Sequence, residues 1–277
     1  MSDEEWEQYK LFFPELVGIP GVSLPKTNTR EVLNALRYME RSGVPFRNLP
    51  HDFPPWSTIM KHFHRWRDEG RFQEFREHMA ARNREKAGRN AAPTAGAMDS
   101  QSKKTAALTP SKEVGTDGGK KIKGRKRHIF VDILGIVLAV TVTPASVQDR
   151  VGGAALMATV ASLIPTMQLV LVDSAYNGDV MAKASQETGI KVEMVNKLEG
   201  QSGFVPIPKR WPVERTFGWM DWSRRLSKDY EKTAESSQAW FDVAMGRLLS
   251  QRWVGRAPRI RQTMAGKVSL ETETMCV

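Results

Sequence analysis

The stretch that decides the fold is Lys209-Arg-Trp-Pro-Val-Glu-Arg-Thr-Phe-Gly-Trp-Met-Asp-Trp-Ser-Arg-Arg225. Pro212 suits the first position of a helix, where its missing N–H is not needed. Val213, Phe217 and Met220 then recur at i, i+4 and i+7, which predicts one apolar stripe. The stretch therefore predicts an amphipathic helix that packs on a core and continues to about residue 226.

Glu214 lies off that stripe, on a face that it shares with Asp221 and Arg225. A single Glu at such a place is usually a solvated residue or a capping partner. Two other acids give it a functional interpretation, because Asp99 follows a run of small residues and Asp173 ends an apolar run. We expect two carboxylates at strand ends and one on a later helix, which could converge on hard divalent cations.

Several short motifs occur in a fixed order along the chain. Together they resemble the motifs of bacterial insertion-sequence transposases of the DDE type, in insertion-sequence family five within the wider family-four-like superfamily. The order and spacing of the motifs, over roughly residues 1 to 253, carry this resemblance. The matching stretches are Asp99-Ser-Gln-Ser, Gly119-Lys-Lys-Ile-Lys-Gly-Arg-Lys-Arg-His-Ile-Phe-Val-Asp, Val142-Thr-Pro-Ala-Ser-Val-Gln-Asp-Arg, Val172-Asp-Ser-Ala-Tyr-Asn-Gly, Arg210-Trp-Pro-Val-Glu-Arg-Thr-Phe, and the run Arg-Arg-Leu-Ser-Lys-Asp-Tyr-Glu at 224–231.

The resemblance implies a site and a reaction. Asp99, Asp173 and Glu214 would be the catalytic residues and would hold two Mg²⁺ ions, with Mn²⁺ able to substitute and Asp99 bridging both ions. Activated water would cut each transposon end, and the freed 3′-hydroxyl would attack target DNA. The implied partner is double-stranded DNA, as terminal inverted repeats and as target, and joining two ends implies a homodimer on DNA.

Composition agrees with a polyanionic partner. The chain has 277 residues, 40% of them hydrophobic, a formal net charge of +10 and a pI of about 9.8. The single cysteine, Cys276, excludes a disulfide within the chain and a cysteine zinc site, and it fits a reducing cytoplasm. The first ten residues do not resemble a signal peptide. The most apolar run, residues 129–142, is too short to span a bilayer, so we expect a cytoplasmic, nucleoid-associated protein without a membrane partner.

The chain divides into three predicted parts. Residues 1–88 predict a small all-α domain, residues 89–253 the catalytic domain, and residues 254–277 a mobile tail. The third N-terminal helix carries a basic face, which fits either a recognition helix or a solvated surface. The resemblance favours DNA-end recognition or dimer assembly for this domain.

The second part predicts an α/β fold with the order βββαβαβα. This order is typical of a ribonuclease-H-like core, a mixed sheet flanked by helices, and the resemblance implies the same fold. The expected elements are a strand ending near Asp99, two strands joined near Leu134-Gly135, a helix at 149–163, a strand at 169–173, a helix at 179–188, a strand at 190–195, and a last helix at 233–253.

A dense basic cluster precedes the apolar strand predicted at 129–133. Such runs are often solvated tails. Because this one leads into a strand, we expect it to be fixed to the core and to position phosphates near the acids. The predicted DNA-binding residues are Lys120, Lys121, Lys123, Arg125, Lys126 and Arg127 of this cluster, with Arg210, Arg215, Arg224 and Arg225 around the decisive helix.

Departures from the family pattern leave one other function open, and a second would share the three acids without needing the N-terminal helical domain. Ile207 and Asp221 stand where the family signature has Tyr and Lys, and Ala175 and Asn177 depart from the usual residues after the second acid. One alternative is a transposase-derived DNA-binding protein that has lost catalysis. Another is a nuclease of the ribonuclease-H type that cuts RNA–DNA hybrids.

Overall fold

The structure, a computed structural model, describes residues 1–13, 27–107, 109–195 and 211–256. Within these ranges, no helix combines the length and apolar character that a bilayer span requires. The strands of this part are β1 (Ala95–Lys104), β2 (Gly115–Asp117), β3 (Ile122–Asp132), β4 (Val137–Pro144), β5 (Leu169–Val172) and β6 (Lys191–Met194). The helices are α1 (Asp3–Tyr9), α2 (Thr29–Ser42), α3 (Trp56–Asp68), α4 (Arg71–Lys86), α5 (Asp149–Leu163), α6 (Asp179–Thr188), α7 (Trp211–Asp221), α8 (Arg224–Ser227) and α9 (Ala234–Trp253), with 3-10 turns η1 (Phe46–Asn48), η2 (Ser111–Glu113) and η3 (Ser174–Tyr176).

The strands form one mixed sheet. Its path is β2-β3-β1-β5-β6, with β4 also beside β3. β3 pairs antiparallel with β1 and β4, whereas β5 pairs parallel with β1 and β6. Parallel neighbours need a crossover connection, and α5 and α6 provide the two crossovers. This mixed sheet with flanking helices agrees with the predicted ribonuclease-H-like α/β core.

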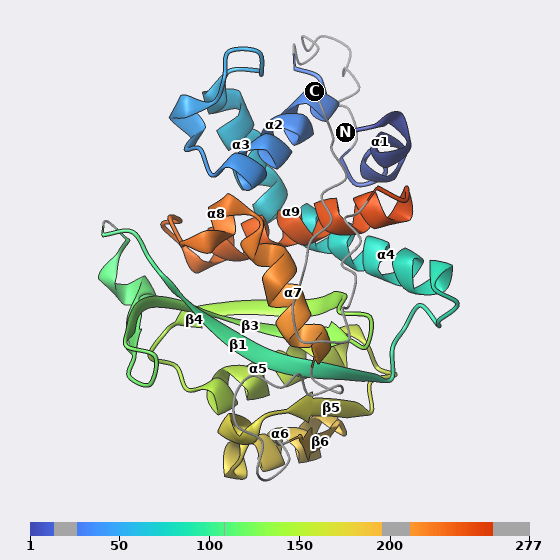
Figure 1. Ribbon diagram of the computed structural model, residues 1–277, viewed down its shortest axis with the longest axis vertical. Helices are drawn as coiled ribbons and strands as arrows, with labels where there is room; N and C mark the ends of the chain where they lie inside the picture. Colours follow the sequence, from blue (N-terminus) through green and yellow to red (C-terminus); the bar gives the residue numbers. More distant parts are fainter. Residues whose placement is uncertain (14–26, 108, 196–210, 257–277) are drawn as a thin grey trace, which may run out of the picture.

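Helices cover both faces of the sheet. In Figure 1, α5 and α6 lie below it, α7 crosses its other face, and α9 lies between the sheet and the N-terminal helices. Side chains alternate along a strand. On β1, Ala97 packs into the core that contains Phe217 of α7, and Met98 packs into the core that contains Leu156 of α5. We call these the α7 face and the α5 face.

α9 is buried around its circumference. All residues from 236 to 250 are buried except Gln238, which is half-buried. Trp240 stacks on Phe63 of α3, with ring centres 4.6 Å apart, and α9 also contacts α2, α4 and β4. A helix buried on all sides belongs to the interior of a core. The N-terminal helices and the sheet therefore share one hydrophobic cluster through α9.

Buried ion pairs join the same elements. Arg76 of α4 lies 2.7 Å from Asp242 of α9 and also donates hydrogen bonds to two carbonyls of β4. Arg247 of α9 lies 2.7 Å from Glu40 of α2. Because breaking a buried pair is strongly destabilising, these contacts hold α9 to both sides. The division predicted near residue 88 falls between α4 and β1, and the packing is continuous across it.

Several predicted boundaries are confirmed. The chain turns from β3 into β4 at Leu134-Gly135. α5 and α6 have the predicted limits, and α6 ends at Gly189 with a φ of 71°. This left-handed conformation at a helix end favours glycine.

Two predicted boundaries are wrong. β1 does not end near Asp99 but continues five residues, because β3 pairs with it as far as Gly124. The helix of the decisive stretch stops at Asp221 instead of reaching residue 226. Ser223, directly after it, is fully buried and donates a hydrogen bond to the Glu40 carboxylate, so the chain leaves the helix to make this contact.

Candidate active site

Asp99 and Asp173 lie at the same level of two neighbouring parallel strands. The register of β1 and β5 pairs Ala97 with Leu171, and two further residues along each strand bring Asp99 beside Asp173. Ala97 and Leu171 both belong to the α7 face, and side chains two residues apart share a face. Because adjacent strands lie about 4.8 Å apart, the two acids come together on the α7 face.

Backbone N–H groups hold one oxygen of each of these acids. Asp99 Oδ1 accepts a hydrogen bond of 2.7 Å from the N–H of Ser100. Asp173 caps η3, and its Oδ1 accepts a hydrogen bond of 2.9 Å from the N–H of Ala175. Both acids are half-buried. These contacts fix the direction of the carboxylates.

Glu214 lies in the first turn of α7, which contacts β1 and β3. The predicted apolar stripe is confirmed, because Val213, Phe217 and Met220 are buried. Glu214 itself is half-buried, and its Oε2 is buried with no hydrogen-bond partner among the described residues. A buried acceptor without a donor is costly. This oxygen is therefore a candidate for binding a ligand.

The three acids offer only oxygen ligands, which Mg²⁺ prefers. Within the described ranges, no group of three His, Cys, Asp or Glu side chains is close enough to hold a metal ion. The structure therefore brings Asp99 and Asp173 together but does not bring Glu214 within ligand distance of both. The donor set and the unpartnered Oε2 of Glu214 fit a hard divalent cation.

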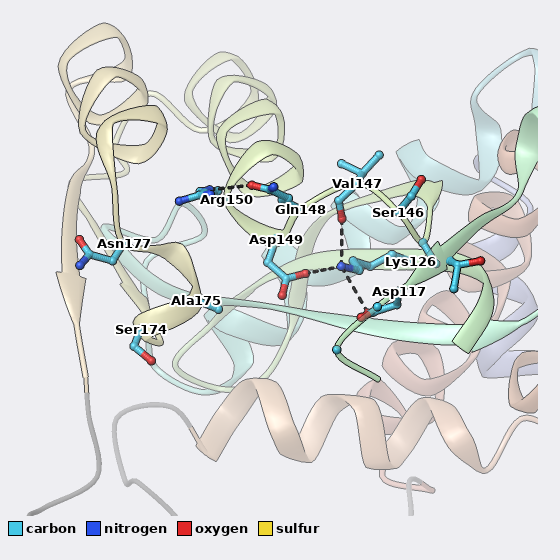
Figure 2. A pocket seen from close by; sticks show the side chains of 14 residues that line it. Asp117, Lys126, Ser146, Val147, Gln148, Asp149, Arg150, Ser174, Ala175 and Asn177 are labelled. Atoms are coloured by element: carbon cyan, nitrogen blue, oxygen red, sulfur yellow. Dashed lines mark hydrogen bonds and ion pairs between the residues drawn. The ribbon is translucent and has the colours of Figure 1, made fainter. Parts of the chain in front are cut away.

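An open cavity of about 430 Å³ lies between the β2–β3 turn, the start of α5 and η3. It borders the turn that follows Asp173. Figure 2 shows the Lys126 ammonium between two acids of this cavity. Lys126 Nζ lies 2.8 Å from Asp149 and 3.4 Å from Asp117, and it donates a hydrogen bond of 2.9 Å to the carbonyl of Val147.

Serine hydroxyls of β1 complete this arrangement on the α5 face. Ser100 and Ser102 each donate a hydrogen bond of 2.6 Å, to Asp149 and Asp117 respectively. The hydrogen bond from Ser102 is the largest cause that lowers the pKa of Asp117 to about 2. Burial raises the pKa of Asp149, but hydrogen bonds from Lys126 and Ser100 outweigh it and lower the pKa overall. Both acids are therefore ionised and compensated inside the protein.

Tyr176 of η3 lies between the two groups of acids. Burial raises the pKa of its hydroxyl well above 10, and the charges of Asp99, Asp149 and Asp173 raise it further. Gly153 of α5 leaves room for the ring, because a Cβ there would lie 2.7 Å from the Tyr176 ring. Asp99, Asp149 and Asp173 therefore all lie within electrostatic reach of the Tyr176 hydroxyl.

The basic cluster divides into an exposed half and a buried half. β3 begins at Ile122, so most of the cluster belongs to the strand and does not precede it. Arg125 pairs with Asp229 at 3.2 Å, and Arg127 donates to a carbonyl of α8. The exposed side chains are those of Lys120, Lys121 and Lys123, and the buried ones are those of Arg125, Lys126 and Arg127.

The arginines around α7 also differ. Arg215 donates a hydrogen bond of 2.9 Å to a carbonyl of the β3–β4 turn. Arg224 is exposed, whereas Arg225 is buried and lies 2.6 Å from Glu231. Arg210 lies outside the described residues. Arg215 and Arg224 therefore present cations near the surface, and Arg225 serves an internal contact.

Asp221, at the position where the family signature has Lys, holds a cation from β1. Its carboxylate lies 2.6 Å from Lys103 and accepts a hydrogen bond of 3.3 Å from Gln101. Gln101 and Lys103 lie two and four residues after Asp99, so the three side chains share one face of β1. A positive charge is thus present beside the end of α7, supplied by the strand.

Sequence reasoning missed two features near these acids. The Lys126 network had one signal, the alternation of Ser100 and Ser102 with other residues of β1, which predicts a polar environment on one face. Arg252 lies 3.9 Å from the ring centre of Trp219. No local pattern could predict that contact between residues far apart in the sequence.

Comparisons with known proteins identify the family of the chain. A family model described as "Transposase DDE domain" matches residues 90–249, and one described as "Putative transposase of IS4/5 family" matches residues 1–76. The chain is 34% identical over 74 residues, 27% of its length, to "Uncharacterized protein y4sN" of Sinorhizobium fredii. It is 28% identical over 127 residues, 43% of its length, to "Putative transposase for insertion sequence element IS402" of Burkholderia cepacia. These matches span 58% and 60% of the two relatives.

The first of the two family models covers more than half of the chain and contains the three candidate acids. Proteins of that family act on DNA and generally use divalent metal ions. The sheet register, the position of α7 and this match agree, and the chain belongs to the DDE transposase family, in its IS4/5 branch.

Proposed function

We propose that the chain is an active DNA transposase that cuts insertion-sequence ends and joins the freed 3′-hydroxyls to target DNA by two-metal phosphoryl transfer. The observation that carries the proposal is the register of β1 and β5, which sets Asp99 beside Asp173. α7 brings Glu214 to the same face of the sheet. Family membership supports the same function.

In this proposal Asp99, Asp173 and Glu214 would hold two Mg²⁺ ions, for which Mn²⁺ could substitute. When bound, the ions would supply an activated nucleophile and stabilise charge at the leaving oxygen. The chain's own part is to orient the ligands. The N–H groups of Ser100 and Ala175 hold one oxygen of each strand acid, and α7 holds Glu214 on a rigid element.

The nucleophile changes between the two stages. Water attacks first and frees a 3′-hydroxyl at each end of the element, and that hydroxyl then attacks a phosphodiester of target DNA. Each stage breaks one P–O bond and forms another, so strand transfer needs no nucleoside triphosphate. Both stages use the same three carboxylates.

The proposed partner is double-stranded DNA, as terminal inverted repeats and as target. The exposed lysines Lys120, Lys121 and Lys123 lie at or next to the β2–β3 turn, and Arg224 lies beyond the end of α7. The helical domain of residues 1–88 would recognise the ends or assemble the complex. Joining two ends requires a homodimer on DNA, in the bacterial cytoplasm and at the nucleoid.

A second candidate is a catalytically impaired, transposase-derived DNA-binding protein. The ion pair between Asp221 and Lys103 favours it, because the cation beside α7 comes from a different position than in the family signature. The two candidates differ in one property, since the impaired protein would bind element ends and leave them intact.

The test is strand cleavage on duplexes that cover the DNA flanking the gene. We expect the purified chain to nick at the repeat ends with Mg²⁺ or Mn²⁺ and to leave the DNA intact in EDTA. If the chain bound these duplexes but cut them under none of the conditions, the second candidate, an impaired DNA-binding protein, would be supported instead. Preferential cutting of RNA–DNA hybrids, with the repeats ignored, would contradict a transposase and support a ribonuclease-H-type nuclease.

A further inference from the structure

Two arginines lie against one tryptophan of α7. The guanidinium carbon of Arg215 lies 4.8 Å from the ring centre of Trp219, and that of Arg252, in the last turn of α9, lies 3.9 Å from it. All three residues are half-buried, so each remains partly accessible. We call this group the Arg–Trp–Arg stack. It adjoins Glu214 along α7.

Neither arginine of the stack forms an ion pair within the part of the chain that the structure describes. Arg252 has no ion pair or side-chain hydrogen bond there, and Arg215 donates only to the carbonyl of Leu134. The charge of Asp132 raises the pKa of both arginines, but this acid is fully buried and pairs with Arg84 instead. Burial is the largest cause that lowers the pKa of Arg252 to about 10, and the charge of Arg215 lowers it further. Two desolvated cations thus share one site.

An arginine with a structural role has a different environment in this protein. Arg225 also lies over an indole, 4.2 Å from the ring centre of Trp240. It pairs with Glu231 at 2.6 Å and donates to the carbonyl of Val44, and it is buried. The buried Arg225 therefore combines its contact with an indole ring with an ion pair and a hydrogen bond to a carbonyl. Arg252 contacts an indole ring but forms no ion pair among the described residues.

Neighbouring cations extend the positive surface. α4 and α9 run side by side (Figure 1), and Arg82 and Lys86 of α4 lie 4.1 and 5.3 Å from the ring centre of Trp253. Structural roles account for both, because Arg82 donates to Gln8 and Lys86 donates to the last carbonyls of α9. These two cations therefore lie against the residue next to Arg252, and contacts within the fold hold them there.

We propose that the Arg–Trp–Arg stack is a binding site for the phosphate backbone of duplex DNA, with Arg252 as the contact and Trp219 as the surface that holds it in place. Guanidinium is weakly hydrated, its planar fork matches phosphate oxygens, and it stacks on rings. A phosphate would supply the missing negative charge. The inference rests on the proposed function, because it takes DNA as the polyanion, and it extends the DNA-contacting surface to the C-terminal end of α9.

The experiment measures binding of a short fluorescein-labelled DNA duplex in EDTA, where no cleavage occurs. Affinity is followed from about 50 to 200 mM salt for the wild type, Arg252→Gln and Arg252→Lys. We expect Arg252→Gln to bind roughly tenfold more weakly and to reduce the salt slope by about 0.9, which is one phosphate contact. Arg252→Lys keeps the charge and should keep the slope.

The matched control is Lys183→Gln, which removes one exposed charge from α6, where Lys183 lies 3.7 Å from Glu187. It should change affinity by less than about twofold, because salt screens exposed charges. A folded Arg252→Gln variant with the wild-type slope and affinity would overturn the inference. So would a wild-type chain that does not bind the duplex.

A second measurement uses the unaltered protein, in case Arg252→Gln fails to fold. Bound duplex should protect Arg252 from modification by phenylglyoxal, read by mass spectrometry, and equal modification with and without DNA would overturn the inference. The two proposals fail separately. A wild-type chain that binds through Arg252 but cuts nothing refutes only the proposed catalysis, and one that cuts while Arg252 stays unprotected refutes only the stack.

Discussion

Two groups of charged side chains, one on each face of the sheet, differ in their partners. On the α5 face, Lys126 lies between Asp117 and Asp149, and serine hydroxyls donate to both acids. On the α7 face, Glu214 keeps a buried oxygen without a hydrogen-bond donor among the described residues, and Arg252 has no acidic partner there. The charges of the first group are paired within the chain, whereas Glu214 Oε2 and Arg252 have no such partner among the described residues.

This difference separates charges that maintain the fold from charges that serve a ligand. Removing a charge from water costs several kcal/mol, and partners must offset that cost. The charges of the α5 network have their partners inside the chain. In our proposal, Glu214 and Arg252 would meet their partners in metal ions and DNA phosphates, whereas other charges of the α7 face, such as Arg125 with Asp229, are paired within the chain.

The largest expected effect on stability comes from Lys126→Met. The change leaves Asp117 and Asp149 buried without their cation, and it should lower the free energy of unfolding by about 3–5 kcal/mol, measured by urea denaturation. Glu214→Gln on the other face should change it by less than about 1 kcal/mol, because no internal donor is lost. Equal losses in the two variants would remove the distinction between the faces.

A glycine-to-alanine pair tests how closely each face is packed. At Gly152 of α5 a Cβ would lie 2.2 Å from the His128 ring, which is fully buried. Gly152→Ala should cost about 1–3 kcal/mol by overpacking. At Gly218 of α7 no atom lies within 4 Å of that position, so Gly218→Ala should stabilise by up to about 1 kcal/mol. Thermal melting compares them, and destabilisation at Gly218 would contradict its position on the exposed side of α7.

Acid should weaken the α5 face through Asp117. The folded-state pKa of this group is about 2, below its ordinary value of 3.8. A depressed pKa stabilises the fold above the ordinary value, and this contribution is lost as the pH falls from about 4 to 2. Unfolding midpoints measured across this range should fall less steeply in Asp117→Asn than in the wild type. Identical slopes would show that the carboxylate has no internal partner.

The smallest effect is expected at Asp221 on the α7 face. Its side chain is 44% exposed, and exposed ion pairs contribute little. Asp221→Asn should therefore change the free energy of unfolding by less than about 1 kcal/mol. A loss of several kcal/mol would mean that the pair with Lys103 belongs to the fold and not to the open surface.

Much of the core could be predicted from the sequence, because local signals determine it. The helices at 149–163 and 179–188 and the stop at Gly189 follow from apolar periodicity and a left-handed glycine. Asp173 could be proposed as a ligand from the sequence because it ends a fully apolar run. Sequence patterns also identified the stripe of α7 and thus the side of the helix that carries Glu214.

Features that depend on a distant partner could not be predicted. The end of β1 is set by pairing with β3 as far as Gly124, and the polar residues after Asp99 gave no sign of it. The same pairing buries Arg125 and Arg127, which local sequence could not distinguish from exposed Lys123. The contact between Trp219 and Arg252 requires the packing of α7 on α9.

The most direct test of the account compares Mg²⁺-dependent cleavage of element ends by Glu214→Gln and Asp149→Asn, each scaled to the DNA bound. We predict that Glu214→Gln loses more than about 100-fold in rate, beyond the 10–100-fold typical of partners outside the ligand set. Asp149→Asn, whose acid is compensated on the α5 face, should stay within about tenfold of the wild type. Wild-type cleavage by Glu214→Gln, or an equal loss in both variants, would contradict the assignment of catalysis to the α7 face.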